Sequence, residues 1–231
     1  MDFDDIYQAF YSLFRADADV PASTEDEYIV GMRLANEAIN HWANFDGTYW
    51  KELFTTLQDN AQTLPVLVKT ITTGTTAYDA PTDFQEAGGY VRVLDSSGNI
   101  VQKYPIIDSS EVQFKSQDGT YCYFTGNKKD GYTLNLNPAP PSSLNGLNFD
   151  YDYYKQPSTF TTGTDVSEMS DPYFIVHRML AQQFRAARNP YYSSALRDSE
   201  NALKIMQTDN NSGTWANPWS QADNSGTSWG L

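Results

Sequence analysis

Residues 121–136, YCYFTGNKKDGYTLNL, consist of two short runs rich in aromatic and aliphatic side chains, joined by a polar segment with a glycine at each end. Tyr121–Thr125 and Tyr132–Leu136 have the composition and length of strands, and the glycine-flanked segment between them has the composition of a turn. The stretch therefore predicts a β-hairpin with Lys128 and Lys129 at its tip.

The same β-type pattern extends over the middle of the chain, from about residue 64 to residue 157. Tyr90–Leu94 and Ile100–Tyr104 flank a polar loop that contains Gly98, so they predict a second hairpin. Val66–Thr72 predicts a further strand that ends at the turn signal Thr73-Gly74. We expect about six antiparallel strands in this region.

Helical periodicity dominates the first 60 residues. Apolar side chains recur at three- and four-residue steps over residues 3–14, and Thr24 with Glu27 predicts a capping box ahead of a second helix. The apolar stripe of that second helix is formed by Tyr28, Ile29, Met32, Ala35, Ile39 and Trp42. After a break at Asp46-Gly47, helical spacing resumes at Trp50, Leu53, Phe54 and Leu57.

Helical periodicity returns near the other end of the chain. Asp171-Pro172 and Asn189-Pro190 each combine a capping residue with a proline suited to the first helical position. The helix after Asp171-Pro172 is predicted to end at Asn189-Pro190, and the last helix at about Gln207. Beyond this point the sequence is polar.

Neither helical zone could bury its apolar stripe alone, which predicts one bundle closed from both ends of the chain. The fold class is therefore α+β, with an antiparallel β-sheet domain inserted into a helical bundle. We expect N-terminal bundle helices in residues 1–60, the β domain in 61–168, C-terminal bundle helices in 169–207 and an extended arm in 208–231.

Composition restricts the class of function. The chain has 231 residues and a net charge of −14, so it lacks the surplus of Lys and Arg that a nucleic-acid-binding face requires. Cys122 is the single cysteine, which excludes an internal disulfide and predicts a small buried side chain. The acidic N-terminal sequence predicts no signal peptide, and no stretch is apolar enough to predict a membrane span.

Residues that could carry catalysis are few. His41 and His177 lack the spacing of a metal site, and no nucleotide-binding glycine motif is present. Asp150 and Asp152 fall on one face of the strand LNFDYDY at 147–153, as a divalent ion or a glycosidase would require. We expect that face to be solvated and assign no catalytic, cofactor or metal residue, so no enzyme is predicted.

Three of the five tryptophans, Trp215, Trp219 and Trp229, lie in the polar C-terminal segment. A segment that stays unfolded has no use for tryptophan, whereas tryptophan is the leading anchor residue of interfaces. The segment is therefore interpreted as an arm that docks on another chain; the alternative is a strap folded back on its own bundle.

Several motifs in this order resemble those of the head-to-tail adaptor (connector) proteins of tailed bacteriophages, over residues 25–207. The segments that carry the resemblance are RLANEAIN at 33–40 with YWKEL at 49–53, TTGTTAYDAPTDF at 72–84, LNPAP at 136–140, FDYDYYKQP at 149–157 and the helix pair from Asp171 to Met206. The C-terminal segment with its tryptophans departs from the pattern.

The resemblance implies a structural virion protein of the neck between capsid and tail, assembled in the bacterial host cytoplasm. Such adaptors form a homo-oligomeric ring, commonly a dodecamer, which binds the portal protein, extends the DNA channel and gives downstream tail or neck proteins a docking platform. DNA passes through without sequence-specific binding, and no membrane or cofactor is involved. In this setting Trp215, Trp219 and Trp229 would dock on the portal or on a neighbouring subunit, and Lys128 and Lys129 would face the lumen or the tail.

Two alternatives to this reading remain open at the level of the sequence. One is another structural protein of the phage neck, such as a tail-completion or fibre-associated protein. The other is a carbohydrate-binding β domain that uses exposed tyrosines with Asp150 and Asp152.

Overall fold

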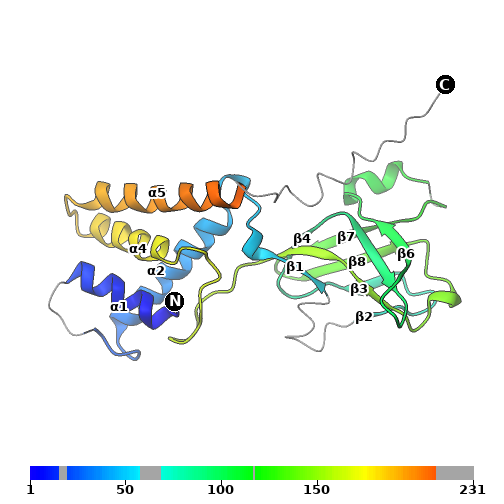
Figure 1. The fold of residues 1–231 in the computed structure, drawn as a ribbon, viewed down its shortest axis with the longest axis horizontal. Coiled ribbons are helices and arrows are strands. Elements are labelled where there is room, and N and C mark those ends of the chain that lie inside the picture. Colours follow the sequence, from blue (N-terminus) through cyan, green and yellow to red (C-terminus); the bar gives the residue numbers. More distant parts are fainter. Residues whose placement is uncertain (16–19, 58–68, 117, 212–231) are drawn as a thin grey trace, which may run out of the picture. The chain divides into compact units, whose positions relative to one another are not determined.

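The computed structural model describes residues 1–15, 20–57, 69–116 and 118–211, which form two compact units (Figure 1). The helical unit comprises Met1–Leu53 and the described residues from Pro157 onward, and the β-unit comprises Phe54–Gln156. Helices and antiparallel sheets in one chain agree with the expected α+β class.

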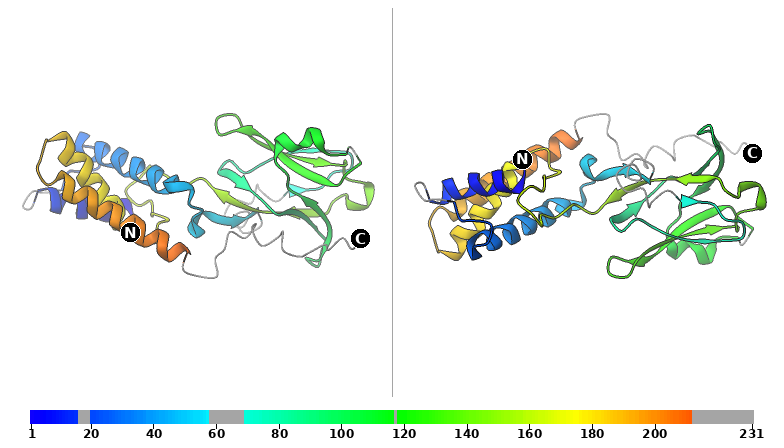
Figure 2. Two further views of the ribbon diagram at one scale, coloured as in Figure 1. Left: turned by 90° about the horizontal axis from the view of Figure 1, so that it is seen from above. Right: turned by 90° about the horizontal axis from the view of Figure 1, so that it is seen from below.

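The helical unit is organised around α4 (Tyr173–Ala186). This helix contacts α1 (Phe3–Phe14), α2 (Asp26–Ala43) and α5 (Tyr192–Asn211). In Figure 1, α5 lies above α4 and α1 lies below it, and both views in Figure 2 show the same four helices packed together. Six residues of α4 are buried, namely Phe174, Ile175, Val176, Met179, Leu180 and Ala181.

Helix α1 begins where the sequence predicts, with Asp2 as its N-cap and Phe3, Ile6, Tyr7 and Phe10 buried. Its Tyr7 ring lies directly against Gly31 of α2, where any side-chain carbon would collide with the ring. Glycine at this position therefore allows the two helices to approach closely.

The buried face of α2 differs from the predicted one. Tyr28, Ala35, Ile39 and Trp42 are buried as expected, but Ile29 is 57% exposed and Met32 is only half-buried. The buried face of α2 instead includes the small residues Gly31, Ala35 and Ala38, and the α1 residue Tyr7 packs directly against Gly31. The buried stripe is therefore rotated away from Ile29.

Two predictions for the N-terminal region are wrong. Thr24 and Glu27 form no capping box, because the helix begins at Asp26 and Glu27 instead contacts Arg15 and Tyr11. The helical spacing from Trp50 to Leu57 does not give an α-helix either. After Asp46 and Gly47, both of which have positive φ, the chain forms the 3₁₀ turn η2 (Lys51–Leu53) and then strand β1 (Phe54–Thr56).

Both cap-and-proline signals near the C-terminus are confirmed as start signals. The Asp171 carboxylate accepts a hydrogen bond from the Tyr173 amide at 3.0 Å, and the Asn189 side chain accepts one from the Tyr191 amide at 2.9 Å. Helix α5 then continues beyond the predicted end at Gln207 to Asn211.

Asn210, in the last turn of α5, connects this helix to the segment that follows α2. Its side chain accepts a hydrogen bond from the Lys51 amide at 2.9 Å and donates one to the Tyr49 carbonyl at 2.9 Å. The residue is almost completely buried. This pair of bonds satisfies backbone groups that the 3₁₀ turn leaves without a helical partner.

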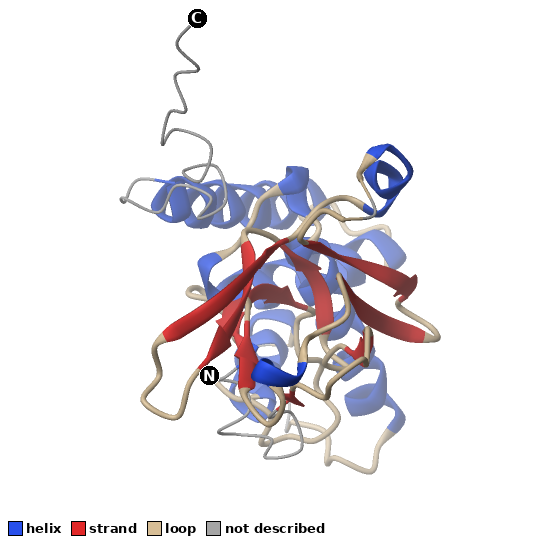
Figure 3. Cartoon of the chain, turned by 90° about the vertical axis from the view of Figure 1, so that its right-hand side faces the viewer, coloured by secondary structure: helices blue, strands red, loops and turns tan. Residues whose placement is uncertain are grey.

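The β-unit contains ten strands within the described residues, drawn in red in Figure 3. They form three antiparallel sheets with the orders β1-β10-β4, β2-β9-β5-β6 and β3-β8-β7. The remaining strands are β2 (Lys69–Thr70), β3 (Ala77–Asp79), β4 (Phe84–Ala87), β5 (Tyr90–Leu94), β6 (Ile100–Pro105), β7 (Tyr121–Asn127), β8 (Gly131–Asn137), β9 (Asn148–Asp150) and β10 (Asp152–Lys155). The number exceeds the expected six because several strands have only two or three residues.

Both predicted hairpins, β5–β6 and β7–β8, are confirmed. The predicted strand at 147–153 is divided at Tyr151 into β9 and β10, which belong to different sheets. Residues 66–68 of the predicted strand at 66–72 lie outside the described residues. One apolar core joins the three sheets, with Phe84, Val91, Val93, Tyr104, Cys122, Leu134, Leu136, Phe149, Tyr151 and Tyr153 among its members.

Replacing Asn210 with Ala should lower the unfolding free energy of the helical unit by about 2 kcal/mol, because it removes two buried hydrogen bonds and leaves their backbone partners unsatisfied. Denaturant titration followed by far-UV circular dichroism measures the effect. The matched control is Asn201→Ala on the exposed face of the same helix, which should change stability by less than about 0.5 kcal/mol. Equal stability of the two variants would contradict the anchoring role of Asn210.

Candidate functional site

The tip of the β7–β8 hairpin presents two neighbouring lysines to solvent. Lys128 and Lys129 are both exposed, and neither forms an ion pair within the part of the chain that the structure describes. The nearby Asp130 carboxylate is instead bound by the Asn127 side-chain amide at 2.9 Å. The tip therefore carries two unneutralised positive charges.

The geometry of this turn follows from its polar and glycine residues. The Asn127 side-chain oxygen accepts hydrogen bonds from the Lys129 amide at 2.8 Å and the Asp130 amide at 3.0 Å. Gly126 and Gly131 both have positive φ, which other residues rarely adopt. Asparagine and glycine thus fix the tip, and the two lysine side chains are left for contacts with other molecules.

The face that carries Asp150 and Asp152 is not solvated, contrary to the sequence-based expectation. Asp150 is 7% exposed and Asp152 is half-buried. The Arg92 guanidinium donates to Asp150 at 2.9 Å and to Asp152 at 2.6 Å. These hydrogen bonds and ion pairs raise the pKa of Arg92 in spite of its partial burial.

This Arg92 clamp lies where the chain passes from one sheet to another. Arg92 is on β5, Asp150 ends β9 and Asp152 begins β10, so one guanidinium holds both sides of the division at Tyr151. Because both carboxylates are bound to Arg92, the pair has the geometry of a structural ion-pair cluster rather than of a sugar-binding or metal-binding site.

The two histidines are not joined by any hydrogen bond or ring contact among the described residues. The His41 ring on α2 stacks on Phe174 with 6.3 Å between centroids. Partial burial, together with the charge of Arg178, lowers the pKa of His41. Across residues 1–15, 20–57, 69–116 and 118–211 there is no group of three or more His, Cys, Asp or Glu side chains that could hold a metal ion.

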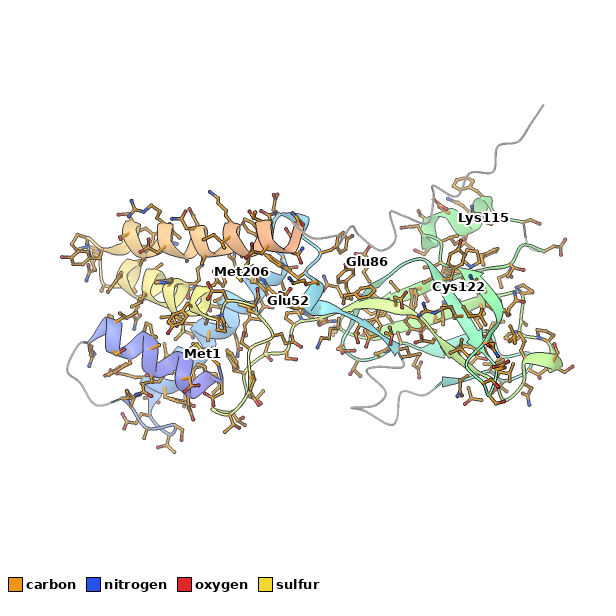
Figure 4. All side chains as sticks on the ribbon, in the orientation of Figure 1. Met1, Glu52, Glu86, Lys115, Cys122 and Met206 are labelled. Atoms are coloured by element: carbon orange, nitrogen blue, oxygen red, sulfur yellow. The ribbon has the colours of Figure 1, made fainter. Side chains whose placement is uncertain are left out.

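Cys122 is completely buried among the side chains of the β-unit (Figure 4). Its thiol contacts the Tyr104 carbonyl at 3.4 Å, and burial raises the pKa of the thiol to about 12. The interpretation of Cys122 as a small core residue is confirmed.

The predicted docking residues Trp215, Trp219 and Trp229 lie outside the described residues. No helix within the described part of the chain is both long and apolar enough to cross a membrane.

Comparison with known proteins identifies the family. The family model for the SU10 adaptor protein matches residues 1–222. The chain belongs to the SU10 adaptor protein family. The match confirms the resemblance to phage adaptors that the sequence motifs indicate, and this family is one of structural adaptors rather than of enzymes. No curated protein matches the chain.

Sequence reasoning missed a basic surface of the adaptor at the turn between α4 and α5. Arg185, Arg188 and Tyr191 are all exposed there, and neither arginine forms an ion pair within the described residues. A signal was available: residues 172–197 contain four arginines and no Asp or Glu, in a chain with 29 acidic residues.

Replacing Arg92 with Met should destabilise the β-unit of the adaptor by about 3 kcal/mol, because two partly buried carboxylates lose their cation. The triple variant Arg92→Met, Asp150→Asn, Asp152→Asn should regain most of this loss, since it leaves no unpaired charge. Denaturant unfolding measures both. The control is Arg33→Met, which breaks the exposed Arg33–Glu37 pair and should cost less than about 1 kcal/mol. An Arg92→Met effect as small as that of the control would contradict a structural clamp.

Proposed function

We propose that this adaptor forms a homo-oligomeric ring, of twelve copies, beneath the portal protein in the virion neck. The ring extends the DNA channel and provides the platform on which downstream tail or neck proteins dock; it is assembled in the bacterial host cytoplasm. The observation that carries this proposal is the family match over residues 1–222. A family of structural adaptors has its function in surfaces that bind other proteins.

The charge of the chain supports a channel role without DNA binding. Twelve copies at −14 each amount to a formal charge of −168. A wall of this sign repels the phosphate backbone, whereas DNA-binding proteins release counterions through a surplus of Lys and Arg. An acidic channel therefore lets DNA pass without retaining it.

The two units provide separate surfaces for separate partners. We assign the portal and neighbouring subunits to the helical unit and the tail to the β-unit. The segment that contains Trp215, Trp219 and Trp229 is assigned to docking on the portal or an adjacent subunit, because tryptophan is the leading interface anchor.

Mass spectrometry of purified virions tests the proposed function. The expected result is about a dozen copies of this chain per particle, measured against the major capsid protein, and retained at the neck after the DNA is released. Absence of the chain from the particle would overturn the proposal. A different copy number at a site away from the portal would favour another structural protein of the neck or tail.

Truncation after Asn211 tests the role of the C-terminal segment. Cutting at Gln207 would remove the buried Asn210 and confuse docking with folding, so Asn211 is the better end point. The shortened chain should keep the circular dichroism spectrum of the parent but enter particles several-fold less often. The triple variant Trp215→Ala, Trp219→Ala, Trp229→Ala should show the same loss of incorporation as the truncated chain. The matched control is Asn217→Ala, Ser220→Ala, Thr227→Ala, which should be incorporated like the parent. Normal incorporation of the tryptophan variant would contradict a docking arm.

Charge reversal tests the hairpin tip. The variant Lys128→Glu, Lys129→Glu should yield DNA-filled heads that lack tails if the tip contacts the tail, or altered DNA release if the tip faces the lumen. Electron microscopy and an ejection assay separate these results. The control is Lys115→Glu, at the exposed residue that follows η4 (Ser109–Phe114), which loses only the exposed ion pair of Lys115 with Glu111. Unchanged particles of the Lys128→Glu, Lys129→Glu variant in both assays would make the tip an ordinary solvated turn.

A further inference from the structure

The outer face of α5 carries positive charge. Ala195, Leu203 and Met206 are buried and mark the side of the helix that packs on α4. Arg197 and Lys204 are seven residues, or two turns, apart and lie on the opposite side, where both are exposed. The exposed Glu200 lies between them along the helix, so these three residues carry a net charge of +1. Neither forms an ion pair within the described residues, so their charges are available to another molecule.

The turn before α5 extends this basic face. Arg188 is exposed and has φ of 53°, in the left-handed region that glycine normally occupies after a helix. An arginine at such a position is locally unfavourable compared with glycine. Tyr191, beside it, is 68% exposed. We call Arg188, Tyr191, Arg197 and Lys204 the basic flank.

The helices from the other end of the chain carry the opposite charge. Residues 1–53 contain three Lys or Arg and eleven Asp or Glu, a net charge of −8, whereas residues 172–211 contain five and three, a net charge of +2. On the exposed face of α2, Asp26 and Glu37 accompany Ile29, which is also exposed. Arg33 lies on the same face and contacts Glu37 in an exposed ion pair at 3.9 Å, whereas Asp26 forms no ion pair within the described residues. We call Asp26, Ile29 and Glu37 the acidic flank.

The two flanks lie on opposite sides of the helical unit. Helix α4 contacts α1, α2 and α5, and α5 packs chiefly on α4. Both views of Figure 2 show α2 and α5 along opposite edges of the helical unit. Complementary surfaces on opposite sides of one subunit produce a head-to-tail contact rather than a two-fold dimer, and such a contact closes into a ring when the rotation from copy to copy adds up to a full turn.

We propose that the basic flank of one subunit docks on the acidic flank of the next, and that this contact builds the ring. The inference rests on the proposed ring and names the surfaces that form it. Exposed apolar side chains lie at both surfaces, with Ile205 on α5 61% exposed and Ile29 on α2 57% exposed, so the contact buries apolar area as well as pairing charges. Arginine and tyrosine, as in the basic flank, are enriched at protein interfaces.

A second copy fits the basic flank better than DNA does. The flank offers three cations, whereas tracking a phosphate backbone calls for a broad basic surface. A neighbouring copy brings an acidic flank of opposite charge at the high local concentration of an assembling ring.

Two charge-reversed full-length chains test the proposal. Variant A is Arg197→Glu, Lys204→Glu and variant B is Asp26→Lys, Glu37→Lys. Each is supplied in trans to a phage that lacks its own adaptor gene, and copies per particle are measured by mass spectrometry. Variant A alone and variant B alone should each be incorporated at least tenfold less than the parent chain, because like charges then face each other at every contact.

An equal mixture of A and B should restore incorporation. In an alternating ring, the native acidic flank of A meets the native basic flank of B, and the reversed flank of A meets the reversed flank of B with opposite charge. The matched control is Lys103→Glu, Lys115→Glu on the β-unit, which makes the same charge change and should be incorporated normally. Thermal melts by circular dichroism check folding. If variant A melts at a lower temperature than the parent, Arg197→Gln, Lys204→Gln replaces it, and if variant B does, Asp26→Asn, Glu37→Gln replaces it. Each neutral variant should be incorporated three- to tenfold less than the parent chain.

The outcomes separate this inference from the proposed function. If the parent chain supplied in trans is absent from particles, the adaptor function itself fails. If the parent chain is incorporated and A and B are incorporated equally well, the flank contact is overturned while the function stands. Loss with A that the mixture does not restore also overturns the contact, and shows that the basic flank binds DNA or the portal instead.

Discussion

The burial of α4 is the constraint on which the helical unit depends. A helix with six buried residues in fourteen cannot be covered by one neighbour, and here α1 and α2 from the beginning of the chain cover it together with α5 from the end. The unit therefore cannot form until both ends of the chain are present. Hydrogen bonds reinforce this closure, since Asn36 pairs with both backbone groups of Phe160 and Asn210 holds the backbone of Tyr49 and Lys51.

Because the helical unit is built from segments on both sides of the β-unit, the β-unit is an insertion between α2 and α4. The insertion begins with β1 and ends with β10, and these two strands pair with each other, Phe54 opposite Tyr154. Strand pairing thus holds the two ends of the insertion together, and the Arg92 clamp holds the chain where it passes between sheets. Such closure allows each unit to keep its own core, which suits a protein whose family role is to connect other proteins.

The distribution of charge gives the helical unit its functional asymmetry. Acidic side chains predominate in the helices before the insertion and basic ones in α4 and α5 after it, so the two halves of one unit differ in sign. In a ring this arrangement favours contacts between unlike surfaces and disfavours contacts between like ones, which selects the direction of assembly as well as its strength.

The elements of the fold were largely predictable from local patterns. The hairpins β5–β6 and β7–β8 follow from strand composition and glycine-containing turns, and the starts of α4 and α5 follow from Asp171-Pro172 and Asn189-Pro190. These signals act over a few residues, and at these four positions no tertiary contact overrides them. The motifs that resemble the adaptor family could be recognised for the same reason, because each is a short contiguous segment.

Other features depended on contacts between distant residues. The helical spacing of Trp50–Leu57 gave way to a 3₁₀ turn and a strand because β10 supplies a partner for Phe54–Thr56. Asp150 and Asp152 are paired because Arg92, about sixty positions earlier, lies on the neighbouring strand β5. The sequence by itself determined the α+β class, the lysine tip of its hairpin and membership of a phage adaptor family. Only the tertiary structure decided which carboxylates are neutralised and which cations are left for partners, because ion pairing depends on distance in space rather than on position along the chain.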